Sequence, residues 1–176
     1  MSTNLVHSDD ALRITEIFYS LQGEARTVGL PTVFVRLTGC PLRCVYCDTE
    51  YAFSGGELYS LDDVVAKVVA YQPRFVTVTG GEPLAQPNCL PLLTALCDAG
   101  YEVSLETGGA MPVAGVDGRV VKVIDLKTPA SGEMPLRMVR NTPCMTSVRA
   151  MMFSNAAESR RVCLRVMFSR NKRCRS

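Results

Sequence analysis

The sequence predicts an α/β fold built on a parallel β-sheet, and three observations lead to this prediction. Segments with strand character alternate with segments whose apolar residues recur at helical spacing, which is the pattern of right-handed β–α–β units. Short runs that could carry chemistry directly follow the predicted strands. The chain has 176 residues, of which 47% are hydrophobic, and this is enough for one domain with an apolar core.

The first two predicted strands flank a glycine-containing loop. Residues 13–19 combine alternation with Ile, Thr, Phe and Tyr side chains that favour extended backbone. A polar stretch follows over 20–31, and residues 32–37 (TVFVRL) then predict a second, largely buried strand. This strand runs directly into a segment with three cysteines, so we expect these cysteines at its carboxyl end.

A helix and a third strand are predicted next. Ser60 has an acidic residue three positions later, which is typical of a helix N-cap, and Pro73 ends the helix. Residues 75–79 (FVTVT) form the next strand and lead into residues 80–83 (GGEP). The apolar positions of the helix have the spacing of one face. They are Leu61, Val64, Val65, Val68 and Val69.

A second helix and two more strands complete the predicted sheet. Gly100 lies where a helix stop is expected, and residues 101–106 and 120–126 have strand character. The apolar stripe of this helix comprises Cys89, Leu92, Leu93, Leu96 and Cys97. In such sheets function gathers at the carboxyl ends of the strands. The runs expected there are the cysteine segment, GGEP, Glu106-Thr-Gly-Gly and Asp125-Leu-Lys.

Charge and composition change sharply near Glu133. Residues 1–133 carry nine basic and sixteen acidic residues, whereas residues 134–176 carry ten basic residues and one acidic residue, six of the eight Met and no Gly. We therefore expect a core domain over 1–133 and an atypical basic tail over 134–176. Our hypothesis is that the reading frame was lost after Glu133, which would leave the tail poorly ordered and a strand edge unpaired near 120–126. A basic nucleic-acid-binding arm is the alternative.

The chain has neither an export leader nor an apolar stretch of roughly 20 residues, so we expect a cytoplasmic protein without a membrane span. Thiols stay reduced in the cytoplasm, so its eight cysteines are expected to be metal ligands or core residues. Cys40, Cys44 and Cys47 form a C-x3-C-x2-C motif, in which each thiolate can bind one iron of a 4Fe–4S cluster. A zinc site is the alternative, but it would need a fourth ligand, and the single histidine is His7.

C-x3-C-x2-C after one strand and GGEP after the next resemble the radical S-adenosylmethionine (SAM) superfamily. The resemblance implies a partial (β/α) barrel of the radical SAM type, here expected to be incomplete at its C-terminal end. It also implies a 4Fe–4S cluster whose open iron binds S-adenosyl-L-methionine. Reductive cleavage of that cofactor would then give a 5′-deoxyadenosyl radical.

Residues 18–24 (FYSLQGE), 34–40 (FVRLTGC) and 47–49 (CDT) are similar to the 7-carboxy-7-deazaguanine synthase family. This implies a carbon–nitrogen lyase that contracts 6-carboxy-5,6,7,8-tetrahydropterin to 7-carboxy-7-deazaguanine with loss of ammonia. The product serves queuosine biosynthesis and hence tRNA modification. The resemblance further implies Mg²⁺ as a cofactor and an electron donor such as flavodoxin. It is compatible with a homodimer, and it implies neither a membrane nor a direct nucleic-acid partner.

The same resemblance assigns roles to individual residues. Arg36, inside an apolar strand, needs an anion, which is either a substrate carboxylate or Glu16 or Glu24. Thr49 is implied as a Mg²⁺ ligand, although by itself it would also suit a turn cap. The residues implied for substrate are Leu21, Gln22, Gly23, Arg36 and Thr79. Those implied for the cofactor are Tyr46, Gly81, Glu82, Glu106, Thr107, Gly108, Asp125, Leu126 and Lys127.

Two other functions stay open at this point. A radical SAM enzyme that installs a glycyl radical on a protein would share the cysteine motif. A non-catalytic iron–sulfur fragment would share it too. The LQGE run, Arg36 and the Asp48-Thr49 pair favour the pterin enzyme.

Overall fold

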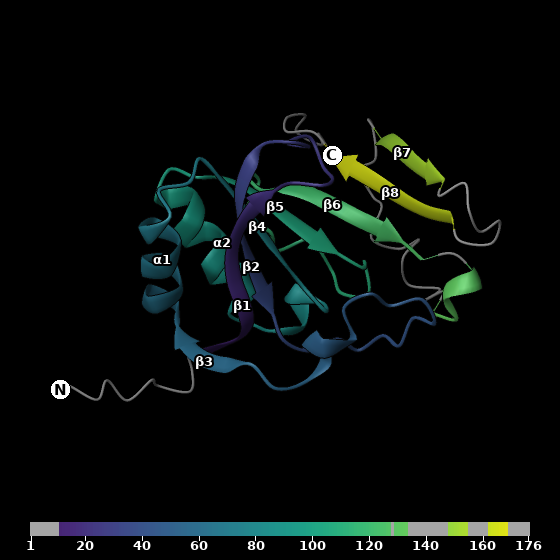
Figure 1. Ribbon diagram of the computed structural model, residues 1–176, viewed down its shortest axis with the longest axis horizontal. Helices are drawn as coiled ribbons and strands as arrows, with labels where there is room; N and C mark the ends of the chain where they lie inside the picture. The colour runs from purple at the N-terminus through teal and green to yellow at the C-terminus, as the bar shows by residue number, and fades with distance from the viewer. Residues whose placement is uncertain (1–10, 128, 134–147, 155–161, 169–176) are drawn as a thin grey trace.

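The computed structural model describes residues 11–127, 129–133, 148–154 and 162–168. Eight strands in these segments form one sheet in the order β3-β1-β2-β4-β5-β6-β8-β7 (Figure 1). The strands are β1 (Ala11–Leu21), β2 (Pro31–Leu37), β3 (Glu57–Ser60), β4 (Phe75–Gly80), β5 (Glu102–Thr107), β6 (Val121–Leu126), β7 (Val148–Ser154) and β8 (Val162–Phe168).

The centre of the sheet is parallel, as the alternation of strands and helices predicts. β2, β4, β5 and β6 pair in parallel, and the sheet is mixed because β1 pairs antiparallel with β2 and with β3. The four-residue strand β3 was not predicted. Such a short segment has too little periodicity to be distinguished from a loop by sequence alone.

Both predicted helices form, and both lie on one side of the sheet in Figure 1. α1 (Leu61–Ala70) begins after Ser60, whose Oγ accepts a hydrogen bond from the backbone N–H of Asp63 at 3.1 Å, so the predicted N-cap is confirmed. α2 (Cys89–Asp98) ends before Gly100, which takes the left-handed φ of 91° that suits a glycine stop. Neither helix has the length and apolar character needed to cross a lipid bilayer.

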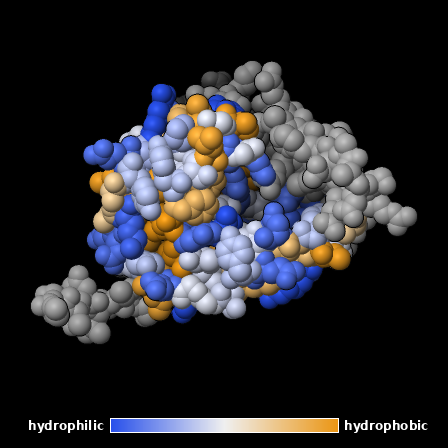
Figure 2. Space-filling model, viewed as in Figure 1, coloured by the Kyte–Doolittle hydropathy of each residue, from blue (hydrophilic) through white to orange (hydrophobic). Residues whose placement is uncertain are grey.

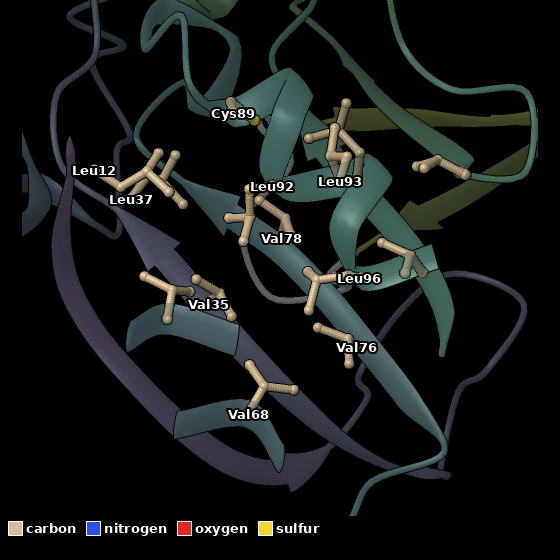
Figure 3. Close-up of a cluster of buried hydrophobic side chains, with 14 of the residues drawn as sticks. Leu12, Val35, Leu37, Val68, Val76, Val78, Cys89, Leu92, Leu93 and Leu96 are labelled. Atoms are coloured by element: carbon tan, nitrogen blue, oxygen red, sulfur yellow. The ribbon is translucent and has the colours of Figure 1, made fainter. Parts of the chain in front are cut away.

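The apolar core lies between these helices and the sheet. Leu92, Leu93 and Leu96 of α2 point toward alternate residues of the parallel strands (Figure 3). The strand residues in this cluster include Val33, Val35 and Leu37 of β2, Val76 and Val78 of β4, and Val103 and Leu105 of β5. Successive strand side chains point to opposite faces, so the residues between these belong to the other face.

That other face carries polar residues at its centre, beside the apolar residues Phe34, Val121 and Val123. It carries Thr32, Arg36, Thr77, Thr79, Ser104 and Glu106, most of which are buried. Figure 2 shows that the molecule is hollowed near the middle of the face drawn there, with hydrophilic residues at the border of the recess. Buried polar groups need partners or a ligand, so this face is where a site is expected.

The sheet continues past β6, which corrects one expectation. Residues Val123 to Leu126 pair antiparallel with Leu164 to Met167 of β8, so the expected unpaired edge near 120–126 is wrong. An edge strand presents free N–H and C=O groups, and the later segment supplies β-favouring residues that can take them. Residues 134–147, 155–161 and 169–176 of the predicted tail lie outside the described residues.

Candidate active site at the carboxyl ends of the parallel strands

The three cysteines of the motif lie on the loop that leaves β2, and all three are free, half-buried thiols. Burial raises the pKa of Cys40, and the charges of Glu82, Cys44 and Cys47 act in the same direction, against a hydrogen bond from the Leu42 backbone. Cys89 differs because it is fully buried in α2, where burial raises its pKa to about 12. The prediction that Cys89 belongs to the core is confirmed.

The cysteine loop is held by the segment that follows β6. The backbone N–H of Arg43 donates to Glu133 Oε1 at 2.9 Å, and that of Val45 donates to the Ser131 carbonyl at 2.9 Å. The Arg43 guanidinium also lies 4.4 Å from the centre of the Phe53 ring. Sequence reasoning missed Ser131 and Glu133, because no local pattern links two segments so far apart in the chain.

The two glycines of the GGEP turn are needed because the turn contacts the cysteine loop. A Cβ on Gly80, which has a φ of 153°, would lie 2.3 Å from the Leu37 carbonyl oxygen. A Cβ on Gly81 would lie 2.4 Å from the Gly39 carbonyl oxygen and 2.7 Å from Cys40 Cβ. Only glycine permits this approach, so the turn after β4 fixes the start of the metal-binding motif.

Glu82 joins the turn after β4 to the turn after β5. Its side chain is only 1% exposed and accepts hydrogen bonds from Thr107 Oγ1 at 2.8 Å and from the Gly108 N–H at 3.0 Å. Burial raises the pKa of Glu82, although these hydrogen bonds oppose the rise. Both carboxylate oxygens are engaged within the protein, so Glu82 holds the turn after β4 against the turn after β5.

Lys127, which follows β6, lies beside the turn after β5 and the cysteine loop. Its Nζ donates to Asp125 Oδ2, and its Cε lies 3.6 Å from where a Cβ on Gly108 would be. Burial alone would lower the pKa of Lys127, but the hydrogen bond and charge of Asp125, with the nearby Cys44, outweigh it and raise the pKa. The ammonium therefore stays charged beside the cysteine loop. The side chain of Leu126, also predicted here, lies outside what the structure describes.

Tyr46 has a buried hydroxyl that the structure leaves without a hydrogen-bond partner among the described residues. The residue lies between Cys44 and Cys47 in the chain. A buried hydroxyl without a partner is costly, so a ligand with a polar group would stabilise this position.

Glu106 lies on the polar face with residues predicted to bind substrate. Its carboxylate accepts hydrogen bonds from Thr79 Oγ1 at 3.1 Å and Gln22 Nε2 at 3.3 Å. Gln22 Nε2 also donates to Thr77 Oγ1 at 2.9 Å, and Thr77 shares a hydrogen bond with Ser104 at 2.8 Å. Burial raises the pKa of Glu106, against these hydrogen bonds and the charge of Arg36. The structure thus places Glu106 beside Gln22 and Thr79, which are predicted to bind substrate, while the cofactor contact that the resemblance implies for Glu106 stays a prediction.

Arg36 forms one of the two ion pairs that the sequence left open. Its Nε donates to Glu16 Oε1 at 2.7 Å, and its side chain is 17% exposed. The same Glu16 oxygen accepts a hydrogen bond from the Tyr51 hydroxyl at 2.8 Å. Among the described residues, the hydrogen bonds of Arg36 come from Nε alone, which leaves the terminal nitrogens for another acceptor. Tyr51 was not predicted, because a tyrosine in a loop has no periodic context.

The remaining predicted residues lie at the border of this region. Leu21 is 63% exposed and Gly23 is also exposed, so only Gln22 of that run enters the buried network. Thr49 Oγ1 donates to Asp48 Oδ1 at 2.7 Å. Thr49 precedes the short helix η2 (Glu50–Phe53) but makes no side-chain capping bond to it. The Thr49 and Asp48 oxygens are therefore adjacent at the surface end of the cysteine loop.

Comparison with known proteins identifies the family. The model of the Radical SAM superfamily matches residues 34–125, which span the cysteine loop, the GGEP turn and the strands through β6. The chain belongs to the radical SAM superfamily. The 7-carboxy-7-deazaguanine synthase of Chlorobaculum tepidum is 51% identical over 123 residues, which are 70% of this chain and 56% of that protein.

One further relative is similar in sequence, and one solved structure is similar in fold. The 7-carboxy-7-deazaguanine synthase of Koribacter versatilis is 47% identical over 137 residues, which are 77% of this chain and 61% of the relative. The crystal structure of QueE from Escherichia coli superimposes with a TM-score of 0.65 at 27% identity, and it covers 80% of this chain and 72% of that one. The chain thus spans 56% to 61% of the length of these two curated relatives.

The radical SAM site has donors that fit a 4Fe–4S cluster. The described residues contain no group of three Cys, His, Asp or Glu side chains placed around one metal ion. A cubane cluster does not require such a group, because each cysteine binds a different iron. Three free, half-buried thiols on one loop match that donor set.

Proposed function

We propose that this protein is a 7-carboxy-7-deazaguanine synthase, which contracts 6-carboxy-5,6,7,8-tetrahydropterin to 7-carboxy-7-deazaguanine with loss of ammonia. The observation that carries the proposal is the position of Arg36 on the polar face. Its terminal nitrogens have no hydrogen bond among the described residues, and a guanidinium so placed suits a carboxylate. The names of the relatives reported above support the same activity.

The substrate half of the proposed site consists of polar groups that the sheet holds in place. Arg36 would bind the carboxylate of the pterin, and Thr79, Gln22 and Glu106 would face its polar ring. The backbone of Leu21, Gln22 and Gly23 would border the ring, where β1 ends. These residues already form a network, so ligand binding would order few additional side chains.

The residues proposed to bind the cluster and S-adenosyl-L-methionine lie at the carboxyl ends of the same parallel strands. Cys40, Cys44 and Cys47 would hold the cluster, which with S-adenosyl-L-methionine would supply a carbon-centred radical for hydrogen-atom abstraction from the substrate. The adenosylmethionine would lie along the Gly81 and Gly108 turns, with the Tyr46 hydroxyl, Thr107, Asp125, Leu126 and Lys127 nearby. Lys127 would present a positive charge there, and the buried turns would exclude water.

The adjacent Thr49 and Asp48 oxygens would provide protein ligands for Mg²⁺, which prefers hard oxygen donors and usually keeps several waters. An electron donor of the flavodoxin class would reduce the cluster. A cytoplasmic location and a homodimer also belong to this proposal.

The activity is tested with anaerobically reconstituted full-length chain, reductant, adenosylmethionine and the carboxylated pterin. We expect 5′-deoxyadenosine and 7-carboxy-7-deazaguanine by liquid chromatography and mass spectrometry. The Arg36→Lys variant should bind the pterin more weakly, because a lysine ammonium cannot form a bidentate pair with a carboxylate. It should still cleave adenosylmethionine in the absence of substrate. Formation of 5′-deoxyadenosine without any turnover of the pterin would overturn this substrate assignment.

A further inference from the structure

Arg36, in β2, is restrained by residues from two other segments of the described chain. It lies opposite Glu16 in the β1–β2 register, and its Nε donates to Glu16 Oε1 at 2.7 Å. The Tyr51 hydroxyl, which comes from the segment after the cysteine motif, donates to the same oxygen at 2.8 Å. Glu16 Oε1 is thus fixed by two donors, and the Arg36 guanidinium is fixed by Glu16.

Two aromatic rings add a second restraint. The Arg36 Cζ atom lies 5.8 Å from the ring centre of Phe18 and 5.8 Å from that of Tyr51. Phe18 is itself stacked on Phe34 with ring centres 5.0 Å apart, so it cannot easily move away. A guanidinium bound at Nε and placed against two rings has lost most of its rotamer freedom before any ligand arrives.

We propose that Glu16 and Tyr51 are positioning residues that preorganise Arg36 to receive the anionic group of the substrate. The proposal rests on the function proposed above, in which that group is the pterin carboxylate. A preordered side chain pays less entropy on binding, and the free terminal nitrogens are then presented in one orientation. Because Tyr51 follows Cys47 closely in the chain, the orientation of Arg36 depends on the segment that also carries the cluster ligands.

The Tyr51→Phe variant tests this role with little risk to folding, because Tyr51 is 58% exposed and its ring is retained. In reconstituted holoenzyme, calorimetry should show the Kd for 6-carboxy-tetrahydropterin raised about fivefold to tenfold, the loss expected for one hydrogen bond. The Kd for tetrahydropterin without a carboxylate should not change. Glu16→Gln should act in the same direction. Equal weakening for both ligands would mean a general structural role and would overturn the proposal.

Tyr59→Phe is the matched control. The Tyr59 hydroxyl donates to Glu57 Oε2 at 2.6 Å and its ring lies 4.9 Å from Lys67 Nζ, so it reproduces the same two interactions away from the site. We expect both Kd values to equal those of the wild-type protein.

A readout that needs no substrate separates this proposal from the proposed function. The Arg36 Nε–H signal in ¹⁵N NMR should be sharp and slow to exchange in the wild-type protein, and broadened in Tyr51→Phe. If no pterin binds the wild-type protein, the proposed function fails, and the NMR comparison still decides the positioning role. An unchanged Nε–H signal in Tyr51→Phe would overturn it.

Discussion

At the scale of single residues, the cysteines fall into two groups with different surroundings. Cys40, Cys44 and Cys47 are half-buried on one loop, whereas Cys89 and Cys97 lie in the core face of α2. Burial raises the pKa of Cys89 to about 12, so its thiol stays protonated and is a poor metal ligand. This difference gives each cysteine a testable role.

We therefore expect alanine at Cys40, Cys44 or Cys47 to abolish cluster assembly. The wild-type chain should bind about four irons and four sulfides on anaerobic reconstitution, as a cubane cluster requires. Cys89→Ala is the control and should keep full iron content, with stability lowered by about 1 kcal/mol for the lost core volume. Iron and sulfide analysis measures the first effect and thermal melting the second. A protein that retained only zinc would contradict the cluster.

Glu106 makes stability depend on pH. Burial raises its pKa in the folded state, so the folded protein favours the protonated carboxyl more than the unfolded chain does. The stabilising contribution is then complete at low pH and is lost as the pH rises through the folded-state pKa. We expect the melting temperature of the wild-type protein to fall relative to that of Glu106→Gln as the pH rises through the folded-state pKa of Glu106, since glutamine cannot ionise.

The opposite trend would show that the hydrogen bonds of Thr79 and Gln22 outweigh burial. A ¹³C NMR titration of the Glu106 carboxyl reports the same pKa directly, and it should give a midpoint above the ordinary value.

At the scale of elements, the site depends on turns that follow neighbouring parallel strands. The turn after β4 contacts the loop after β2, and Glu82 joins it to the turn after β5. Because β2, β4 and β5 pair in parallel, the turns that follow them lie together at the carboxyl ends of the strands. The geometry of the cysteine loop is therefore set by elements other than its own.

Gly81→Ala tests this dependence, because its Cβ would lie 2.4 Å from the Gly39 carbonyl oxygen and 2.7 Å from Cys40 Cβ. We expect the cysteine loop to shift, iron content after reconstitution to drop severalfold, and stability to fall by about 1–3 kcal/mol from overpacking. Gly118→Ala is the matched control, since a Cβ there meets nothing within 4 Å. Normal iron content in Gly81→Ala would show that the close approach is not required.

At the scale of the whole molecule, the sequence changes in character near Glu133, between residues 1–133 and residues 134–176. The superfamily match ends at residue 125, and the charge changes sign near Glu133. Yet β8 pairs with β6, so part of the later chain completes the sheet edge in the described residues. The division into a core over 1–133 and a tail over 134–176 remains our proposal.

Limited trypsin digestion tests that division. If the proposed division holds, we expect the first cuts among the arginines after Arg137, and a stable core of about the first 130 residues. Mass spectrometry of the fragments identifies the sites. If β8 protects the later chain so that it survives as long as the core, the proposed division is wrong.

The local features of this protein could be predicted from short sequence patterns. Helix and strand periodicity placed α1, α2 and the four parallel strands, and the spacing of Cys40, Cys44 and Cys47 indicated the cluster. These signals are local, because a helical stripe or a three-cysteine loop is complete within about ten residues. The GGEP turn was also readable, since two adjacent glycines mark a close backbone approach.

The contacts between side chains of different elements could not be predicted in this way. The Arg36–Glu16 pair depends on antiparallel pairing of β1 with β2, and a one-residue slip would turn one partner to the opposite face. Glu106 forms a hydrogen bond with Thr79 because the two share a sheet face, while its neighbour Thr107 points toward Glu82. Such contacts depend on register between segments distant in the chain, and sequence periodicity does not encode that register.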